Sequence, residues 1–232
     1  PTPTLGGIGI IFGTWAGVAI GFDLLNLPFP FFLKALMGSS LVIGVLCFDE
    51  VRPMGRISKL VVQSGSSVLL MSSGVILHRI SFPGLGQISL GTMALPVTFL
   101  CLFGIQNLYN FMDGIDGIAG IEGMIVAALI TGLSIQFAPT ISPLYAALAG
   151  AALGFLFLNF PPARIFMGDA GSHFLGLIFG VAAITGETYG LPFVIILLFL
   201  GTFLFDSVYT IFRRLALGEN ITKAHRSHLY QR

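Results

Sequence analysis

The chain has 232 residues, of which 55% are hydrophobic and only 9% carry a charge, and its formal net charge is +1. Because a soluble domain normally has roughly 25% charged residues, this composition excludes an ordinary water-soluble domain. It indicates an integral membrane protein. The near-neutral overall charge says nothing about partners. We expect no binding to nucleic acid.

Apolar stretches follow one another along the chain, and a helix that spans a bilayer needs about 20 mostly apolar residues. We expect an all-α, polytopic membrane bundle that forms one domain over residues 1–232. The eight candidate spans are 6–24, 30–48, 58–77, 93–112, 118–138, 143–160, 171–187 and 191–213. Residues 78–92 differ, because apolar residues there are interspersed with Ser, Gly, Pro and Gln. This pattern predicts a short hairpin or structured loop on the extracytoplasmic face.

The basic residues predict the orientation of these spans. With eight crossings, both ends of the chain lie on one side, and only Lys34 and Arg79 lie toward the other. Since Lys and Arg in short loops mark the cytoplasmic side, the side with most of them is predicted to be cytoplasmic. That side receives Arg52, Arg56, Lys59, Arg164, Arg213, Arg214, Lys223, Arg226 and Arg232.

Four polar patches occupy every second gap between the apolar stretches, so this topology places all of them on the cytoplasmic side. The first patch is Asp49 and Glu50, and the fourth contains His225, Arg226 and His228. The second consists of Asn107, Asn110, Asp113 and Asp116, whose spacing of three would align them on one helix face if the helix continued. The third runs from Asn159 to Asp169 and includes Arg164 and Phe166.

Polar and ionisable groups at a membrane boundary are costly, and this makes the patches functional candidates. Several carboxylates supply the hard oxygen ligands that suit Mg²⁺, with Mn²⁺ as an alternative ion. Structural roles remain open for single members. Asp169 precedes a helix and could cap it, and the His225 segment could contact anionic lipid headgroups. Asp206, inside the last stretch, could pair with a neighbour or mark a path for a lipid phosphate.

Four motifs in order carry a resemblance to a known family. They are Pro3-Thr4-Leu5-Gly6-Gly7, Phe48-Asp49-Glu50, the Asn107 to Gly117 segment, and Phe166-Met167-Gly168-Asp169 with Gly171 and Ser172. Together they resemble the polyprenyl-phosphate N-acetylhexosamine-1-phosphate transferase superfamily of the MraY/WecA type, glycosyltransferase family 4. The ending from His225 to Arg232 is most similar to its WbpL/WecA-like branch. The resemblance covers essentially the whole chain, which would then be a fragment without the family's first and C-terminal helices.

The resemblance implies a magnesium-dependent reaction at the cytoplasmic face of the bacterial inner membrane. A UDP-N-acetylhexosamine-type sugar nucleotide gives its sugar-1-phosphate to undecaprenyl phosphate, and UMP leaves. Such a step starts the synthesis of O-antigen of lipopolysaccharide or of a cell-wall polymer. The identity of the sugar and the oligomeric state, including a homodimer, stay open.

The resemblance also implies roles for single residues. Asp169 would bind magnesium, and Asp49 would act on the lipid phosphate. The other implied catalytic positions are Glu50, Asp113, Asp116, His225 and His228. The implied substrate-binding positions are Thr4, Lys59, Asn107, Asn110, Asn159, Arg164, Phe166 and Arg226. Glu50 replaces the usual second Asp, and Arg226 and Ser227 interrupt the usual run of histidines, which argues against a MurNAc-pentapeptide substrate.

Two other functions fit parts of the sequence. A CDP-alcohol phosphatidyltransferase also has an Asp-rich signature, and Asp113, Asp116 and Gly117 match its start loosely, but Gly120 stands where that signature has Arg. An ion- or proton-coupled transporter also uses intramembrane acids. A transporter, however, needs acids near the middle of the bilayer, whereas those here collect at one boundary.

Overall fold

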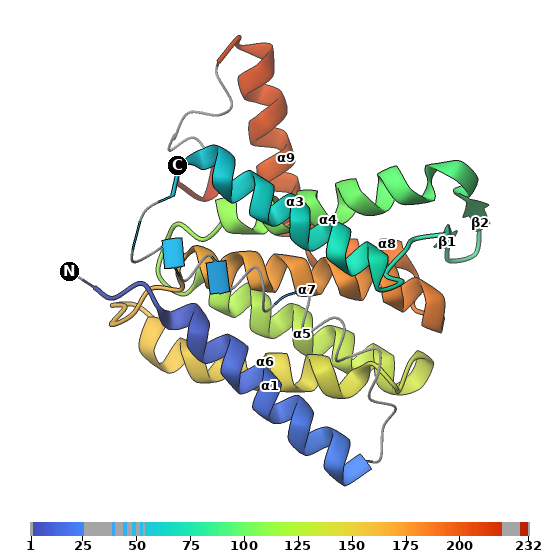
Figure 1. The fold of residues 1–232 in the computed structure, drawn as a ribbon, viewed down its shortest axis with the longest axis horizontal. Coiled ribbons are helices and arrows are strands. Elements are labelled where there is room, and N and C mark those ends of the chain that lie inside the picture. Colours follow the sequence, from blue (N-terminus) through green and yellow to red (C-terminus); the bar gives the residue numbers. More distant parts are fainter. Residues whose placement is uncertain are drawn as a thin grey trace.

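The computed structural model describes residues 2–25, 39, 44–45, 48–49, 52, 54–219 and 228–231. Its helices in these ranges include α1 (Gly6–Leu25), α3 (Arg56–Ser72), α4 (Ala94–Phe111) and α5 (Ile118–Phe137). They continue with α6 (Ser142–Asn159), α7 (Gly168–Tyr189), α8 (Phe193–Phe199) and α9 (Gly201–Ala216). Short 3-10 turns lie at Gly91–Met93 and Leu229–Gln231. The helices pack as a bundle, which confirms the predicted all-α class (Figure 1).

Four helices in the described ranges are long and apolar enough to cross a membrane: α4 with its preceding turn, α5, α6 and α7. The number becomes five if α8 and α9 form one bent span, and α1 contains a shorter apolar helix, Gly6–Gly21. The predicted count of eight spans is therefore not confirmed. The predicted span 30–48 lies largely outside the described residues.

The last predicted span, 191–213, is not one straight helix. It is broken between α8 and α9, whose axes differ by 81°, and α9 projects away from the rest of the bundle (Figure 1). Gly201 is the first residue after the break, and glycine has the weakest helix propensity after proline. Hydrophobicity alone could not predict this bend, because the two helices taken together are apolar enough to pass as one span.

Helix α7 forms the centre of the bundle, and its residues from Ala170 to Glu187 are all buried. Glycine allows its close approach to α4. A Cβ added to Gly176 would lie 2.5 Å from the Cα of Gln106. Such small residues let helix backbones approach without a large side chain between them. The first turn of α7 is therefore held in a fixed place relative to α4.

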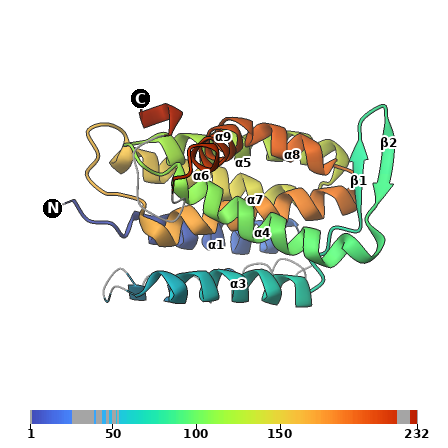
Figure 2. The ribbon, with the colours of Figure 1, turned by 90° about the horizontal axis from the view of Figure 1, so that it is seen from above.

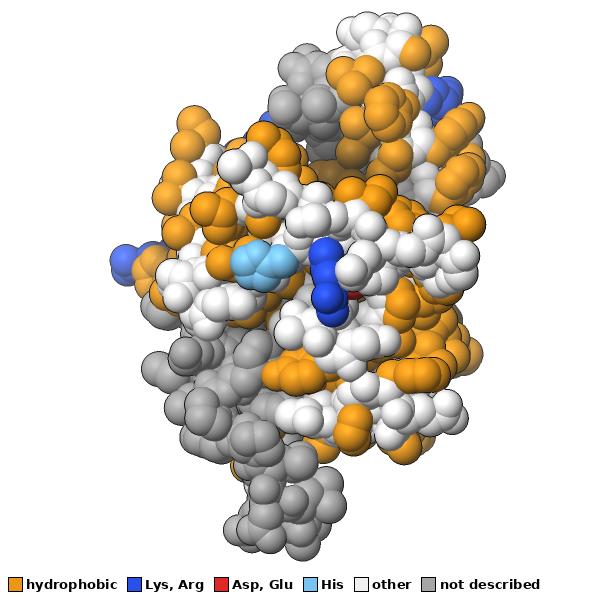
Figure 3. Space-filling model, turned by 90° about the vertical axis from the view of Figure 1, so that its right-hand side faces the viewer, with side chains coloured by type: hydrophobic (Ala, Val, Ile, Leu, Met, Phe, Trp, Pro, Cys, Tyr) orange, Lys and Arg blue, Asp and Glu red, His pale blue; other side chains and the backbone are white. Residues whose placement is uncertain are grey.

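A two-stranded antiparallel hairpin follows α3, as predicted for residues 78–92. Strand β1 (Arg79–Phe82) pairs with β2 (Gly86–Ser89), with Ile80 opposite Ile88. It lies at one end of the bundle, as Figures 1 and 2 both show. Figure 3 views this end, where hydrophobic and neutral polar groups dominate and almost no acidic side chain is visible.

Candidate active site

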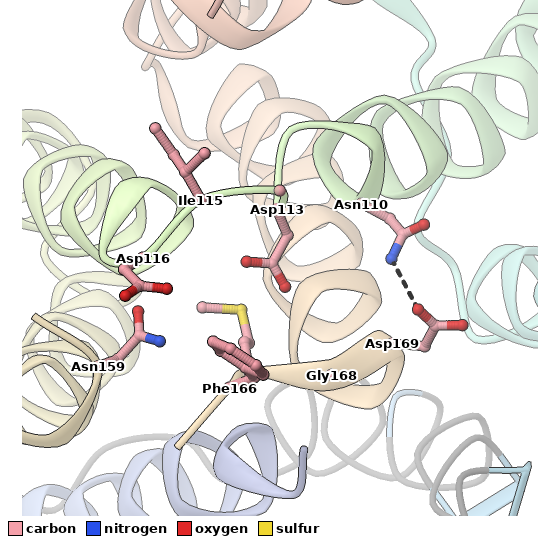
Figure 4. A pocket seen from close by; sticks show the side chains of 10 residues that line it. Asn110, Asp113, Ile115, Asp116, Asn159, Phe166, Gly168 and Asp169 are labelled. Atoms are coloured by element: carbon pink, nitrogen blue, oxygen red, sulfur yellow. Dashed lines mark hydrogen bonds between the residues drawn. The ribbon is translucent and has the colours of Figure 1, made fainter. Parts of the chain in front are cut away.

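The end of the bundle away from the hairpin holds the starts of α1, α3, α5 and α7 and the ends of α4 and α6 (Figures 1 and 2). A cavity of about 350 Å³ lies here. The α4–α5 loop forms one wall, and the segment that leads into α7 forms another (Figure 4). Its lining residues are Asn110, Asp113, Gly114, Ile115, Asp116, Asn159, Phe166, Met167, Gly168 and Asp169.

The second polar patch does not lie on one helix face. Helix α4 ends at Phe111, and α5 begins only after Gly117. Gly117 has a φ of 81°, a left-handed conformation that glycine adopts without steric cost. The chain therefore turns between the helices, and Asp113 and Asp116 reach the cavity from a loop, as Figure 4 shows. The alignment on one helix face required the helix to continue through the patch, and this condition is not met because α4 ends at Phe111.

Asp113 points into the cavity with its carboxylate half-buried (Figure 4). No hydrogen bond to this carboxylate is made by the described part of the chain. Burial, together with the negative charge of Asp169, raises the pKa of Asp113 to about 7. The fold thus holds an acid that is costly to ionise unless a cation or a donor binds beside it.

Asp116 and Asn159 join the two loops that form the cavity. The amide of Ala163 donates to Asp116 Oδ2 at 2.9 Å, and the amide of Gly117 donates to Asn159 Oδ1 at 2.9 Å. Asn159 Nδ2 in turn donates to the carbonyl of Ile165 at 2.8 Å. Asn159 therefore binds the start of α5 and the segment before α7 at once, and these bonds fix the width of the cavity.

Asp169 lies in the first turn of α7 and is the centre of a charge network. Lys59 Nζ lies 2.8 Å from Asp169 Oδ2 and 2.6 Å from Asp49 Oδ2. Asn110 Nδ2 donates to Asp169 Oδ1 at 3.3 Å and to Ser172 Oγ at 2.8 Å. The network joins residues more than 100 positions apart, and it brings the first, second and third polar patches together.

Asp49 is held firmly at the edge of this network. Its side chain is only 5% exposed, and its Oδ1 accepts the amide of Met54 at 2.5 Å. Each carboxylate oxygen of Asp49 thus has a donor. The Lys59 ammonium group lies between Asp49 and Asp169 and is the electrostatic partner of both carboxylates.

The Thr4 segment packs against the chain that enters α7. The amides of Gly6 and Gly7 donate to the carbonyls of Phe166 and Met167 at 2.9 and 2.8 Å, and the amide of Phe166 donates to the carbonyl of Pro3 at 2.7 Å. A Cβ added to Gly7 would lie 2.3 Å from the Cα of Gly171. The motif from Pro3 to Gly7 therefore holds in place the segment of Phe166 and Met167, which lines the cavity.

Several predicted site residues do not line the cavity. Asn107 donates to the carbonyl of Phe103 in its own helix at 2.7 Å and lines a separate apolar cavity. Arg164 is exposed, and His228 is buried with Nδ1 3.3 Å from Asp206 Oδ1. Three further predicted residues lie outside the described ranges, namely Glu50, His225 and Arg226.

Asp206 anchors the segment 228–231, a partner that the sequence did not specify when it allowed Asp206 to pair with a neighbour. Its carboxylate accepts the amides of Leu229 and Tyr230 at 2.9 and 3.2 Å, besides facing His228. A Cβ on Gly114 would lie 2.0 Å from Tyr230 Oη, so the anchored segment reaches the loop of Asp113. The signal that could have revealed this link was a buried acid in one stretch and a histidine beyond it.

The donors at the cavity suit a magnesium ion. In the parts of the chain described, no group of three or more His, Cys, Asp or Glu side chains is arranged to hold a metal. Mg²⁺ commonly takes only one or two carboxylates and completes its shell with water and substrate phosphates. Asp169 and the unbonded carboxylate of Asp113 face the same cavity, so the residues present fit such an ion.

Comparison with known proteins places this geometry in a family. The model of glycosyl transferase family 4 matches residues 32–187, which include the whole cavity. The chain belongs to glycosyl transferase family 4. This membership gives no support to a CDP-alcohol phosphatidyltransferase or a transporter.

Relatives of this family 4 chain agree in the type of reaction that their names describe. A probable undecaprenyl-phosphate N-acetylglucosaminyl 1-phosphate transferase of Bacillus subtilis is 33% identical over 99% of the chain and 65% of its own length. A decaprenyl-phosphate N-acetylglucosaminephosphotransferase of Mycobacterium tuberculosis is 28% identical over 100% of the chain and 65% of its own length. A phospho-N-acetylmuramoyl-pentapeptide-transferase of Synechococcus is 34% identical over 80% of the chain and 56% of its own length. The chain thus spans 65% or less of these three relatives.

Proposed function

We propose that this chain forms the catalytic core of an N-acetylhexosamine-1-phosphate transferase. The donor is a UDP-sugar, the acceptor is undecaprenyl phosphate, and UMP is released at the cytoplasmic face of the membrane. The observation that carries the proposal is the network of Asp49, Lys59 and Asp169 beside the cavity. It gathers both signs of charge at one end of the apolar bundle, as a reaction between two phosphate-bearing substrates requires. The names of the relatives support the polyprenyl phosphate and the amino-sugar phosphate.

Asp169 and Asp113 would hold a magnesium ion, which supplies charge neutralisation on the diphosphate when it is bound. Asn110 orients Asp169 by donating to its Oδ1. Phe166, which is 41% exposed at the cavity, presents an aromatic surface on which the uracil ring stacks. Asp116 and Asn159 keep the two loops at the distance that admits the diphosphate.

Lys59 and Asp49 would act on the acceptor. The Lys59 ammonium attracts the phosphate of the lipid, and Asp49 keeps that phosphate deprotonated or orients it. The lipid phosphate then attacks the phosphorus that bears the sugar, the bond to the UMP oxygen breaks, and UMP leaves with the electron pair. Direct attack inverts the configuration at phosphorus, whereas a route through an aspartyl-phosphate retains it.

Transfer from a labelled sugar nucleotide tests this proposal. Membranes with the full-length protein are incubated with labelled UDP-N-acetylglucosamine, undecaprenyl phosphate and Mg²⁺, and the lipid is extracted. We expect label in the lipid phase that disappears with a chelator and returns with Mg²⁺ or Mn²⁺. A panel of UDP-linked N-acetylhexosamines identifies the sugar. Label that never enters the lipid with any of these donors would contradict the proposal.

A further inference from the structure

The three helices that carry the charge network are joined a second time, one turn deeper in the bundle. The outer layer consists of Lys59 on α3, Asn110 on α4 and Asp169 on α7. The inner layer consists of Gln63, Gln106 and His173 on the same helices. Each inner residue is four positions from its outer counterpart, which is about one helical turn, or ~6 Å along the axis.

Hydrogen bonds connect all members of the inner layer. Gln63 Nε2 lies 2.9 Å from His173 Nε2, and His173 Nδ1 lies 3.2 Å from the carbonyl oxygen of Gln106. Gln106 Nε2 donates to the carbonyl of Gln63 at 3.2 Å. The layer is therefore a closed cycle through α3, α7 and α4.

The cycle fixes the direction of every bond in it. A carbonyl oxygen can only accept, so His173 Nδ1 carries the proton, and Nε2 of the neutral ring accepts from Gln63. All three side chains are buried, with exposures of 3%, 0% and 2% for Gln63, Gln106 and His173. The side-chain oxygens of both glutamines then have no donor within the described structure.

Two unpaired buried acceptors lower stability, so an apolar layer at this depth would hold the helices together at less cost. What the polar cycle adds is direction, because hydrogen bonds fix the rotation and height of each helix more narrowly than apolar contacts do. Lys59, Asn110 and Asp169 lie on the same three helices, one turn closer to the cavity. Their mutual distances therefore depend on the inner cycle.

We propose that His173 is a positioning residue, which through Gln63 and Gln106 sets the mutual geometry of Lys59, Asn110 and Asp169. The kinetic part of this inference rests on the proposed transferase function, whereas the structural part does not. The ring of His173 bonds to Gln63 and Gln106, and neither of these residues lines the cavity. Its effect on the reaction is therefore indirect.

Hydrogen–deuterium exchange tests the structural part without any activity. In the full-length protein, His173→Leu removes both ring bonds, and His173→Gln retains one donor and one acceptor. Thr98→Val is the matched control, because Thr98 is buried and accepts the amide of Leu77 at 2.9 Å, joining α4 to the chain beyond α3 far from the site. We expect faster exchange in residues 56–63, 106–113 and 168–173 for His173→Leu, near wild-type exchange for His173→Gln, and no change there for Thr98→Val.

Kinetics test the consequence for the reaction. Because a displacement of ~1 Å can lower a rate by about a hundredfold, we expect kcat of His173→Leu to fall by roughly ten- to a hundredfold. KM should change less, and His173→Gln should recover most of the rate. Unchanged exchange and unchanged kcat in His173→Leu would overturn the inference, as would an equal loss in Thr98→Val. If the wild type transfers no sugar phosphate, the proposed function fails, and the exchange result alone decides the role of His173.

Discussion

Asp169 joins Lys59 and Asn110 at the cavity, so its carboxylate should be essential for transfer. Asp169→Asn keeps the size of the side chain but removes its charge, and with it the main ligand that we propose for Mg²⁺. We expect transfer to fall at least ~100-fold, in the range seen when a group that stabilises developing charge is removed. Rates of lipid labelling and thermal melting of the purified variant measure activity and folding separately.

The control for this variant is Glu219→Gln, which removes a carboxylate from the ion pair with Arg214 at 2.8 Å, outside the cavity. It should retain normal transfer. Activity close to wild type in Asp169→Asn would remove this residue from the metal role.

Asp113 gives a prediction about pH. Its pKa is raised to about 7 by burial and by Asp169, above the ordinary value of about 3.9 in an unfolded chain. The folded state therefore favours the protonated form of Asp113. The contribution of this protonated form to folding stability is fully present below the unfolded pKa and is lost as pH rises through 7. In a chelator, Asp113→Asn should raise the melting temperature at pH 8.5 more than at pH 5. An equal shift at both pH values would show that Asp113 is not the titrating group.

At the scale of elements, the contact between α1 and α7 depends on two glycines. A Cβ on Gly7 would meet the backbone of Gly171, whereas a Cβ on Gly9 in the same helix meets nothing within 4 Å. We expect Gly7→Ala to destabilise the protein by about 1–3 kcal/mol, as overpacking usually does, and to lower transfer by moving Phe166. Gly9→Ala should leave both unchanged. Thermal unfolding and lipid labelling of the two variants provide the comparison, and equal behaviour would contradict the close approach.

The bend between α8 and α9 has a role in holding the end of the chain. It directs α9 so that Asp206 receives two backbone amides of the segment 228–231. Asp206→Ala should release this segment, with deuterium uptake at Leu229 and Tyr230 rising by about tenfold or more, since exchange follows local opening. Uptake that stays slow in this variant would mean that other contacts hold the segment.

For the whole molecule, the hairpin and the cavity should face opposite compartments. Leu85 is 87% exposed in the hairpin turn and Ile115 is 51% exposed at the cavity. In a background with Cys47 and Cys101 replaced by Ala, an impermeant thiol reagent should label Leu85→Cys in intact cells. Ile115→Cys should react only after permeabilisation. Labelling of both positions from one side would contradict the predicted topology.

Much of the fold could be predicted from the sequence, because local signals determine it. Apolar runs bounded by Pro and Gly placed α5 and α6 within a residue or two, and alternation with turn residues indicated the hairpin. The motifs also singled out Asp113 and Asp169, which line the cavity and whose polarity stands out against an apolar background. These features depend on residues close together in the chain.

The remainder depends on contacts between distant residues. The pairing of Lys59 with both Asp49 and Asp169, the inner cycle of Gln63 and His173, and the anchoring of His228 by Asp206 each need the helices to be packed first. The misplacement of Asn107 has the same origin, because only the packing of α4 against its neighbours shows that Asn110 faces the cavity and Asn107 a separate apolar one.

The position of Lys59 has one more consequence. Its ammonium lies 2.8 Å from Oδ2 of Asp169, so the main ligand that we propose for the ion already has a counter-ion within the chain. If the proposed magnesium ion binds, it would replace the Lys59 ammonium as the partner of Asp169 rather than neutralise an unpaired carboxylate. Lys59 would then be free to pair with the phosphate of the acceptor, and the two substrates would bind in that order.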